Sequence, residues 1–468
     1  MLKPLRSLAS LLALGLLATA CGGGDDEGGN GGGGGGNGSG DLPECPLDAL
    51  GSATEPVEVV FWHTMARAND SALIELTDAY NGSQDKVKVT LVNNTAYDDQ
   101  QDKYRAGLTT GDLPDLSLQQ DIFLQQMVDT QTVLPAQSCI DAADFPAADF
   151  VPRTLEYYAI GDVQYGLPFN VSNPVLYYDK AAFTAAGLDP EAPPTSFEDL
   201  RDAAEAVKAS GYTTGMSFKV DSWHFEQLLA LRDQELVDNG NGRDDRASAA
   251  ELDSDAGREV FEFLGAMVAD GLATASPRSG PNQFDNVLGI GNKHHAMTFE
   301  SSAALGTIAE VLGSGQYAGV DLDVAPLPGG NAGGGVAVGG AALYISASDP
   351  AKQAAAWDYM TFLTSPETQS KWAAATGYIP VRTSATELPE ITRRWEEVPG
   401  FKVPYDQLVD GADTPATNGA AIGNYESVRA AVEEAQDTMF LDGVAPADAL
   451  TGAAAEATSA IEAYNNRL

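Results

Sequence analysis

The chain has 468 residues, of which 67 are acidic and 26 basic, so its formal net charge at pH 7 is −41. The acidic residues are spread along the whole chain. Because no basic stripe is present to neutralise phosphates, the composition argues against nucleic acid as a partner. The same charge should repel anionic ligands unless a local cation offsets it.

The first twenty residues have the parts of a secretory signal. Lys3 and Arg6 form a basic segment, residues 8–18 form an apolar segment, and Ala18-x-Ala20 is a small-residue cleavage site. The apolar segment is too short to span a bilayer. We therefore expect residues 1–20 to be a signal peptide that takes no part in the fold.

Cys21 follows the cleavage site directly, and this junction resembles the bacterial lipoprotein signal, in which a lipid-modified cysteine becomes the new N-terminus. That signal usually has leucine where this chain has Ala18, so secretion without a lipid stays open. Residues 22–40 are almost all Gly, Asn, Asp, Glu and Ser and should form a flexible tether. Residues 21–41 would then hold an exported lipoprotein on the periplasmic or cell-surface side, with the lipid as its membrane contact.

Two further cysteines, Cys45 and Cys139, remain once Cys21 is assigned to the lipid. In an oxidising compartment this pair favours one disulfide. Closing a loop of about a hundred residues would stabilise the fold by a few kcal/mol in the chain-entropy model. Two free, buried thiols are the alternative.

Periodicity predicts two α/β units. From Leu42 onward the chain is long enough for two domains, since single cores stop growing near roughly 250 to 300 residues. Strand and helix patterns alternate first: strands at 57–62, 87–91 and 116–118, helices at 69–82 and about 98–111. This order is typical of a parallel sheet covered by helices. Helical patterns recur at 200–207, after a capping box that Thr195 and Glu198 can form, and at 260–271.

The chemistry-bearing residues form no catalytic or metal-binding pattern. The adjacent His294 and His295 would point to opposite faces of a strand and could not chelate one ion. Residues 238–245 lack the alternating oxygens and final Glu of a calcium loop. Nucleophile-elbow, metalloprotease and dinucleotide-binding motifs are absent from the sequence. We therefore predict no catalytic residue, metal or cofactor, although carboxylates are too numerous to exclude a glycosidase pair by counting.

Seven short segments carry a specific pattern: FWHTM (61–65), GDLPD (111–115), PFN (168–170), PVLYYDK (174–180), AGLDP (186–190), AMT (296–298) and TGYIPVR (376–382). In this order they resemble the family 1 extracellular solute-binding proteins, the receptors that feed sugars and glycerol phosphates to ABC importers. The resemblance covers nearly everything after Pro56. It is closest to the glycerol-3-phosphate-binding branch, with the maltose-binding protein more distant.

The resemblance implies an α/β fold of two lobes, the periplasmic-binding-protein fold of type II, with the ligand in the cleft between lobes that close by a hinge. The first lobe would take residues 57–164 and 338–389. The second lobe would take residues 165–337 and 390–468.

The resemblance also implies a ligand site. Position by position, it assigns binding roles to Tyr97, Asp121 (where that branch has Glu), Ser172, Ser301, Gly340 and Tyr378. Trp223 is added as a further aromatic platform. The branch grips the ligand phosphate with an arginine in a Gly-x-Arg-x-Gly turn, and the matching turn at 419–423 has Ala421 in its place.

Alanine cannot supply the paired donors that suit a phosphate. Because Asp121 can accept hydroxyl protons, we expect a neutral sugar or polyol, bound by a monomeric receptor and handed intact to ABC permease subunits. Binding of glycerol-3-phosphate or a glycerophosphodiester stays open if Arg382 supplies a displaced cation. An exported carbohydrate hydrolase and a ligand-presenting sensor are the remaining alternatives.

Overall fold

The computed structural model describes residues 42–276, 285–313, 316–330 and 333–468. The predicted signal peptide (1–20), the lipid site at Cys21 and the tether (21–41) lie outside the described residues, so their roles stay predictions. Within the described ranges, no helix has both the length and the apolar character needed to cross a membrane.

Two β-sheets organise the described chain. The first has the strand order β2-β1-β3-β13-β4, and β7 also pairs with β13. Its strands are β1 (Val57–His63), β2 (Val87–Asn93), β3 (Leu116–Gln120), β4 (Val133–Leu134), β7 (Leu167–Ser172) and β13 (Gly339–Ser346). β1, β2 and β3 are parallel to one another, as the sequence predicts, whereas β13 runs antiparallel to β3. β3 and β7 are buried over nearly their whole length because helices cover the sheet.

The second sheet has the order β10-β9-β11-β8-β12. Its strands are β8 (Pro174–Asp179), β9 (Met216–Lys219), β10 (Ala273–Ser276), β11 (Met297–Ser301) and β12 (Leu322–Pro326). β9, β10 and β11 are parallel, and β8 is antiparallel to β11 and to β12. A hairpin of β5 (Ala159–Ile160) and β6 (Val163–Gln164) is separate from both sheets.

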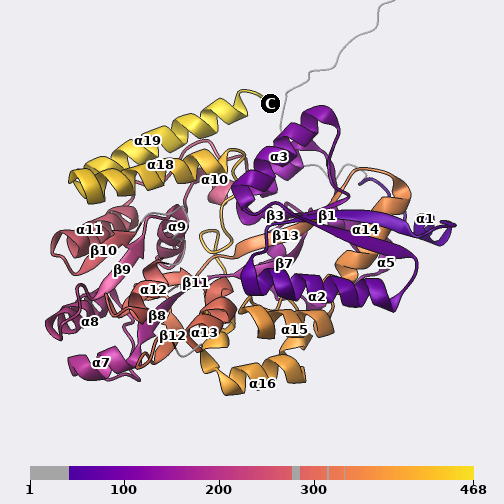
Figure 1. Ribbon diagram of the computed structural model, residues 1–468. Helices are drawn as coiled ribbons and strands as arrows, with labels where there is room; N and C mark the ends of the chain where they lie inside the picture. The colour runs from indigo at the N-terminus through magenta and orange to yellow at the C-terminus, as the bar shows by residue number, and fades with distance from the viewer. Residues whose placement is uncertain (1–41, 277–284, 314–315, 331–332) are drawn as a thin grey trace, which may run out of the picture. The chain divides into compact units, whose positions relative to one another are not determined.

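Helices cover both sheets (Figure 1). α2 packs on β2, α3 on β3, and α14 on β1 and β13, while α11 and α12 pack on the second sheet and α18 and α19 cover α9 and α11. In chain order the helices are α1 (Asp48–Gly51), α2 (Arg67–Ser83), α3 (Tyr97–Thr110), α4 (Leu124–Thr130), α5 (Ala136–Ala143), α6 (Pro152–Glu156), α7 (Lys180–Ala186), α8 (Phe197–Ala209), α9 (Ser222–Ala230), α10 (Asp238–Gly242), α11 (Asp255–Ala269), α12 (Asp285–Gly291), α13 (Leu305–Gly313), α14 (Pro350–Leu363), α15 (Pro366–Thr376), α16 (Pro389–Glu397), α17 (Val403–Asp410), α18 (Tyr425–Asp437) and α19 (Pro446–Asn465).

The predicted helices form, but one cap is shifted. The capping box before α8 is made by Ser196 and Asp199, one residue after the predicted Thr195 and Glu198. The Asp199 amide donates to Ser196 Oγ at 3.1 Å, and the Ser196 amide donates to Asp199 Oδ2 at 3.0 Å. The same carboxylate also accepts the Thr195 hydroxyl. Asp199 therefore binds both residues, which places the start of the helix at Phe197.

The predicted disulfide between Cys45 and Cys139 is confirmed, with the two cysteines 94 residues apart in the sequence. Both residues are buried. The alternative of two free thiols is therefore wrong. Because Cys139 lies on α5, the bridge fastens the segment before β1 to the body that carries the first sheet.

The chain passes from the first sheet to the second at Asn173, between β7 and β8, and returns between β12 and β13. Asn173 is buried, and its Nδ2 donates to the carbonyl of Pro404 at 2.8 Å. β7 belongs to the first sheet although the predicted second lobe starts at residue 165. These crossings are what bring residues of both sheets to one cavity.

Candidate functional site

A cavity of about 380 Å³ lies at the carboxyl ends of the parallel strands of both sheets. Its lining includes the residues that directly follow β1, β2 and β3, and those that end or follow β9 and β11. In open α/β sheets this edge is where ligands bind, because loops and helix starts present their polar groups there. The volume falls in the range of small-molecule pockets, roughly 300 to 1,000 Å³.

All seven predicted ligand residues line this one cavity: Tyr97, Asp121, Ser172, Trp223, Ser301, Gly340 and Tyr378. They come from seven separate segments of the chain, at the start of α3, after β3, at the end of β7, on α9, at the end of β11, in β13 and after α15. The structure therefore brings together the seven residues that the sequence analysis assigned to the ligand site. Their contact with a ligand stays a prediction.

The first wall of the cavity is defined here as Tyr97, Asp121, Ser172, Gly340 and Tyr378, which the first sheet and its loops provide. Tyr378 stacks on Trp372, with ring centroids 5.4 Å apart and planes 8° apart, and Trp372 stacks in turn on Phe169. Burial raises the pKa of Tyr378 to about 12. Its hydroxyl therefore keeps its proton at neutral pH and can donate a hydrogen bond.

Gly340 has no room for a side chain. Its φ is +105°, and a Cβ atom there would lie 2.0 Å from the carbonyl oxygen of Asn170. Glycine is required at this position because the strands β7 and β13 approach so closely.

Asp121 is the most unusual group of the first wall. It is 2% exposed, and its Oδ1 makes no hydrogen bond to the described residues. Its Oδ2 lies 3.6 Å from Nη2 of Arg429. Burial raises the pKa of Asp121 to about 6, and the Arg429 guanidinium opposes this rise. At neutral pH the side chain is therefore mainly a carboxylate with one oxygen able to accept a ligand hydroxyl.

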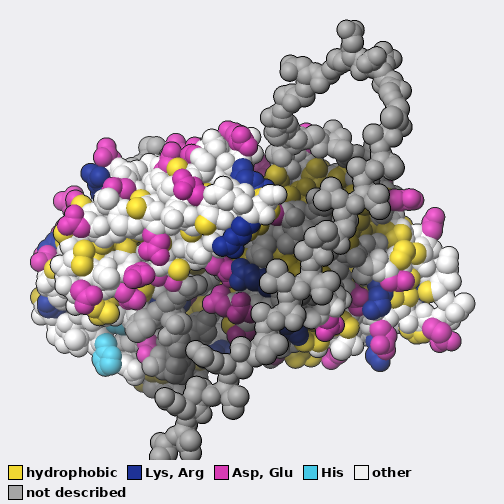
Figure 2. Space-filling view, turned by 90° about the horizontal axis from the view of Figure 1, so that it is seen from above, with side chains coloured by type: hydrophobic (Ala, Val, Ile, Leu, Met, Phe, Trp, Pro, Cys, Tyr) yellow, Lys and Arg dark blue, Asp and Glu magenta, His cyan; other side chains and the backbone are white. Residues whose placement is uncertain are grey.

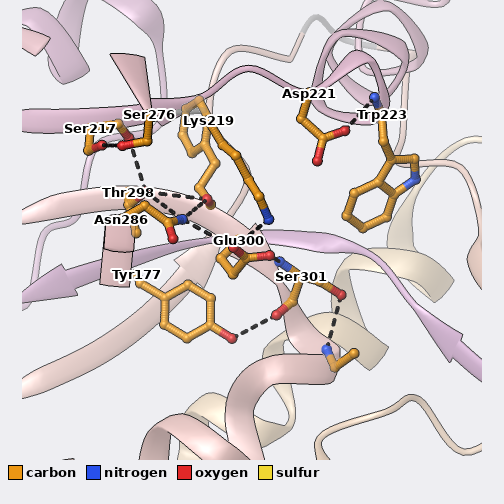
Figure 3. Close-up of polar contacts among 12 residues, drawn as sticks. Tyr177, Ser217, Lys219, Asp221, Trp223, Ser276, Asn286, Thr298, Glu300 and Ser301 are labelled. Carbon is orange, nitrogen blue, oxygen red and sulfur yellow. Dashed lines mark hydrogen bonds and ion pairs between the residues drawn. The ribbon is translucent and has the colours of Figure 1, made fainter. Parts of the chain in front are cut away.

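The second wall is defined here as Lys219, Asp221, Trp223, Glu300 and Ser301 (Figure 3). Nζ of Lys219 donates to Oε2 of Glu300 at 3.2 Å, and the Ser301 amide donates to Oε1 of Glu300 at 2.9 Å. Asp221 caps α9 by accepting the Trp223 amide at 2.9 Å. The polar groups of this wall are thus bound largely to one another.

The lining contains three basic side chains that the sequence analysis missed: Arg67, Lys219 and Arg429. They match three acidic ones, Asp121, Asp221 and Glu300, so the lining has a formal net charge of zero. The alanine at position 421 therefore does not leave the cavity without basic side chains. No motif marks these residues, which lie at the exposed start of α2, at the end of β9 and on α18.

Arg429 is held by a carboxylate next to the cavity. Its Nε donates to Oε1 of Glu226 and its Nη2 donates to Oε2, both at 2.8 Å. The Tyr425 hydroxyl donates to the same Oε2 at 3.1 Å. Two parallel charge-assisted bonds of this kind fix both position and orientation.

The turn at 419–423 does not supply a cation to the cavity. Ala421 is 2% exposed and its amide donates to the Asn241 carbonyl at 2.9 Å. Arg243 lies against this turn, but its three nitrogens donate to the backbone carbonyls of Gly419, Tyr157 and Ala159. The guanidinium beside the turn is therefore used by the backbone.

The hypothesis of a displaced cation at Arg382 is wrong. Arg382 is not part of the cavity lining and is 2% exposed. Its Nε donates to the Thr364 carbonyl at 2.8 Å, and its guanidinium carbon lies 3.8 Å from the centre of the Phe150 ring. The side chain of Arg382 therefore stabilises the packing around the first sheet and does not face the cavity.

The outer surface differs in charge from the cavity. Acidic side chains are spread over the described part of the face shown in Figure 2, in keeping with the net charge of −41. A field of this sign disfavours the approach of anions. The side chains that line the cavity, in contrast, have balanced formal charges.

Comparison with known proteins identifies relatives in sequence and in structure. Residues 75–400 match the sequence profile of the family described as bacterial extracellular solute-binding protein. The sn-glycerol-3-phosphate-binding periplasmic protein UgpB of Yersinia pseudotuberculosis is 27% identical over 409 residues, which cover 85% of this chain and 91% of that protein. UgpB of Escherichia coli K12 is 27% identical over 413 residues, covering 86% of this chain and 92% of that protein.

Two solved structures illustrate the likeness in fold. The GacH receptor of Streptomyces glaucescens, solved unliganded and with acarbose or an acarbose homolog, has a TM-score of 0.72 at 20% identity, covering 87% of this chain and 99% of that one. UgpB of Mycobacterium tuberculosis, solved with glycerophosphocholine, has a TM-score of 0.72 at 20% identity, covering 89% and 99%. The predicted two-lobe α/β fold is thereby confirmed.

Proposed function

The chain belongs to the family of bacterial extracellular solute-binding proteins, and we propose that it binds a solute without net charge and rich in hydroxyl groups, a sugar or polyol. The solute would occupy the cavity between the two sheets and pass unchanged to an ABC permease. One observation carries the proposal: in a lining whose formal charges balance, Oδ1 of Asp121 is a buried acceptor without a hydrogen bond to the described residues.

Arg429 and Lys219 each already bind a carboxylate, so a phosphate would have to compete with Glu226 and Glu300 for them. A buried ion pair is costly to break, because one partner is left without compensation. Hydroxyl groups impose no such cost. They can donate to Asp121, and the apolar faces of a sugar ring fit the rings of Tyr97, Trp223 and Tyr378.

Closure of two lobes would complete the site. We propose lobes at 57–164 with 338–389 and at 165–337 with 390–468, and the pairing of β7 with β13 favours moving the first boundary to about Asn173. Asn69 Nδ2 donates to the Ala303 carbonyl at 3.2 Å, so the two sides of the cavity already touch at this edge. A ligand that contacts both walls would favour the closed state.

Export, membrane attachment and the monomeric state complete the proposal. The family description supports an extracytoplasmic location. The lipid on Cys21 is supported by the cleavage-site sequence. Radiolabelled palmitate should enter the expressed precursor and should fail to enter a Cys21→Ser variant. Label in neither form would mean secretion without a lipid.

Binding without catalysis is supported by relatives whose names describe binding proteins. A sugar recovered intact after prolonged incubation with the protein is the expected result. Release of a shorter product would favour the hydrolase alternative.

A phosphate ester is the second candidate ligand. The basic residues Arg67, Lys219 and Arg429 in the lining favour it, and so do the names of the UgpB relatives. One series of titrations distinguishes the neutral solute from the phosphate ester.

The test is a thermal-shift screen followed by isothermal titration with mono- and oligosaccharides, polyols, glycerol-3-phosphate and glycerophosphocholine. A ligand that binds only the native state must raise the unfolding midpoint. We expect tight binding of a neutral sugar or polyol. Tight binding of glycerol-3-phosphate with no response to any sugar or polyol would contradict the proposal.

A further inference from the structure

We infer that Glu226, which lies outside the cavity lining, determines the charge class of the solute by neutralising Arg429. This inference rests on the proposed function and adds to it a specificity-determining residue that is not itself in the ligand site. Its basis is the contact network of Glu226 on α9 with two residues of α18, Tyr425 and Arg429.

The network is buried and saturated. The side chain of Glu226 is 10% exposed and that of Arg429 is 4% exposed. Both oxygens of Glu226 accept from the guanidinium, and Oε2 also accepts from Tyr425. Since the residues lie 203 positions apart in the chain, the pairing depends on how α18 packs on α9. Glu226 therefore holds Arg429 in one fixed orientation.

The charge balance of this network reaches the cavity. Arg429 lies in the lining, and its Nη2 is 3.6 Å from Oδ2 of Asp121. The three side chains Asp121, Arg429 and Glu226 thus carry one positive and two negative charges. Burial is the main cause of the raised pKa of Asp121, and the charge of Glu226 also raises it. The charge of Glu226 therefore acts at the cavity wall. An anion approaching Arg429 meets a net negative cluster.

Removing the Glu226 charge would leave one positive and one negative group at this place. A unit charge roughly 10 Å from a phosphate, at an effective dielectric constant near 20, corresponds to about a tenfold change in affinity. The guanidinium would also recover donors able to grip two phosphate oxygens. Glu226 is a cleaner target than Glu300, because Glu300 is itself part of the cavity lining.

The experiment compares Glu226→Gln with the wild type by isothermal titration, using glycerol-3-phosphate and the neutral solute identified for the wild type. We expect the affinity for glycerol-3-phosphate to rise by about tenfold or more. The affinity for the neutral solute should stay within about threefold, since a neutral ligand is insensitive to the field.

Three variants separate this effect from a general loosening of the site. Tyr425→Phe removes one hydrogen bond to Glu226 but no charge, and should gain no phosphate affinity. Glu226→Asp keeps the charge and should behave as the wild type toward glycerol-3-phosphate. Adding Arg429→Gln to Glu226→Gln should abolish the gain. If Glu226→Gln does not fold, Glu226→Met fills a similar volume without charge and gives the same test.

Two outcomes have separate meanings. A folded Glu226 variant that binds the neutral solute and gains no affinity for glycerol-3-phosphate overturns this inference and leaves the proposed function intact. A wild-type protein that binds glycerol-3-phosphate tightly and no neutral solute overturns both.

Discussion

The two walls of the cavity use their polar groups in opposite ways. On the side of the first sheet, Oδ1 of Asp121 is a buried side-chain oxygen with no hydrogen bond to the described residues. On the side of the second sheet, Glu300 accepts from Lys219, Asn286 and Ser301. An unpaired buried acceptor is costly unless a ligand satisfies it.

This difference between the walls indicates which wall is expected to recognise the ligand. The first wall has unmet hydrogen-bonding capacity, and a ligand that supplies hydroxyl donors gains most there. In the second wall, the carboxylates of Glu300 and Asp221 accept hydrogen bonds before any ligand arrives, so this wall acts mainly as a shaped surface. Substitutions in the two walls should therefore differ in effect.

The largest effect is expected at Gly340 of the first wall. Gly340→Ala places a Cβ atom 2.0 Å from the Asn170 carbonyl at a φ of +105° and should destabilise the fold by about 3 kcal/mol or more. Gly452→Ala is the control, because Gly452 on α19 has open space around its Cβ position and should be neutral or slightly stabilising. Urea denaturation measures both. Equal stability of the two variants would show that the β7–β13 approach is not rigid.

The disulfide offers a change that should affect stability but not recognition. Cys45→Ser with Cys139→Ser removes a link between residues 94 apart, and the chain-entropy model gives a loss of about 5 kcal/mol. Since the bridge lies away from both walls, ligand affinity should stay within about twofold, as titration of the folded variant would show. A large loss of affinity would mean that the bridge positions the first wall.

Asp121 should dominate recognition in the first wall. Asp121→Asn replaces a charged acceptor and should weaken binding of the neutral solute by about 10- to 100-fold, the range of a hydrogen bond to a charged group. Ser301→Ala is the matched change in the second wall, where Oγ already accepts the Ala303 amide at 3.1 Å, and should cost less than about fivefold. Isothermal titration compares them. Similar losses in both variants would remove the distinction between the walls.

The pH dependence should follow Asp121. Its folded pKa, raised by burial to about 6, lies above that of the unfolded chain, so the native state holds the proton more tightly. Protonation removes the acceptor, and affinity should fall about tenfold between pH 7 and pH 5. From this group alone, stability should rise as pH falls from 6 toward 4, because the buried charge is lost. Titrations across this range should show a flat profile for Asp121→Asn.

The smallest effect is expected at Tyr378. Tyr378→Phe removes the hydroxyl but keeps the ring stacked on Trp372, so affinity should fall only about two- to fivefold. Replacing the ring by Tyr378→Ala should cost more. Equal losses for both variants would mean that the hydroxyl alone matters.

The sequence predicts the position of the site well and its charges poorly. Short motifs lie beside Ser172 (168–170) and Ser301 (296–298), and Tyr378 lies within the motif at 376–382, so local pattern and position coincide at these residues. Arg429 and Lys219 have no such flanking pattern. Whether they are available to a ligand depends on Glu226 and Glu300, which reach them only through helix and strand packing. The shift of the cap from Thr195 to Ser196 has a local cause, since the carboxylate of Asp199 accepts the amides of both residues.

The stack of Phe169, Trp372 and Tyr378 places a tryptophan directly behind the cavity wall, so its fluorescence can report ligand binding. Trp372 is fully buried one ring behind Tyr378, and Trp223 lines the cavity itself, so two of the five tryptophans stand at or beside the site. A solute that presses on either ring changes the surroundings of an indole. Intrinsic fluorescence should thus report occupancy without any attached dye.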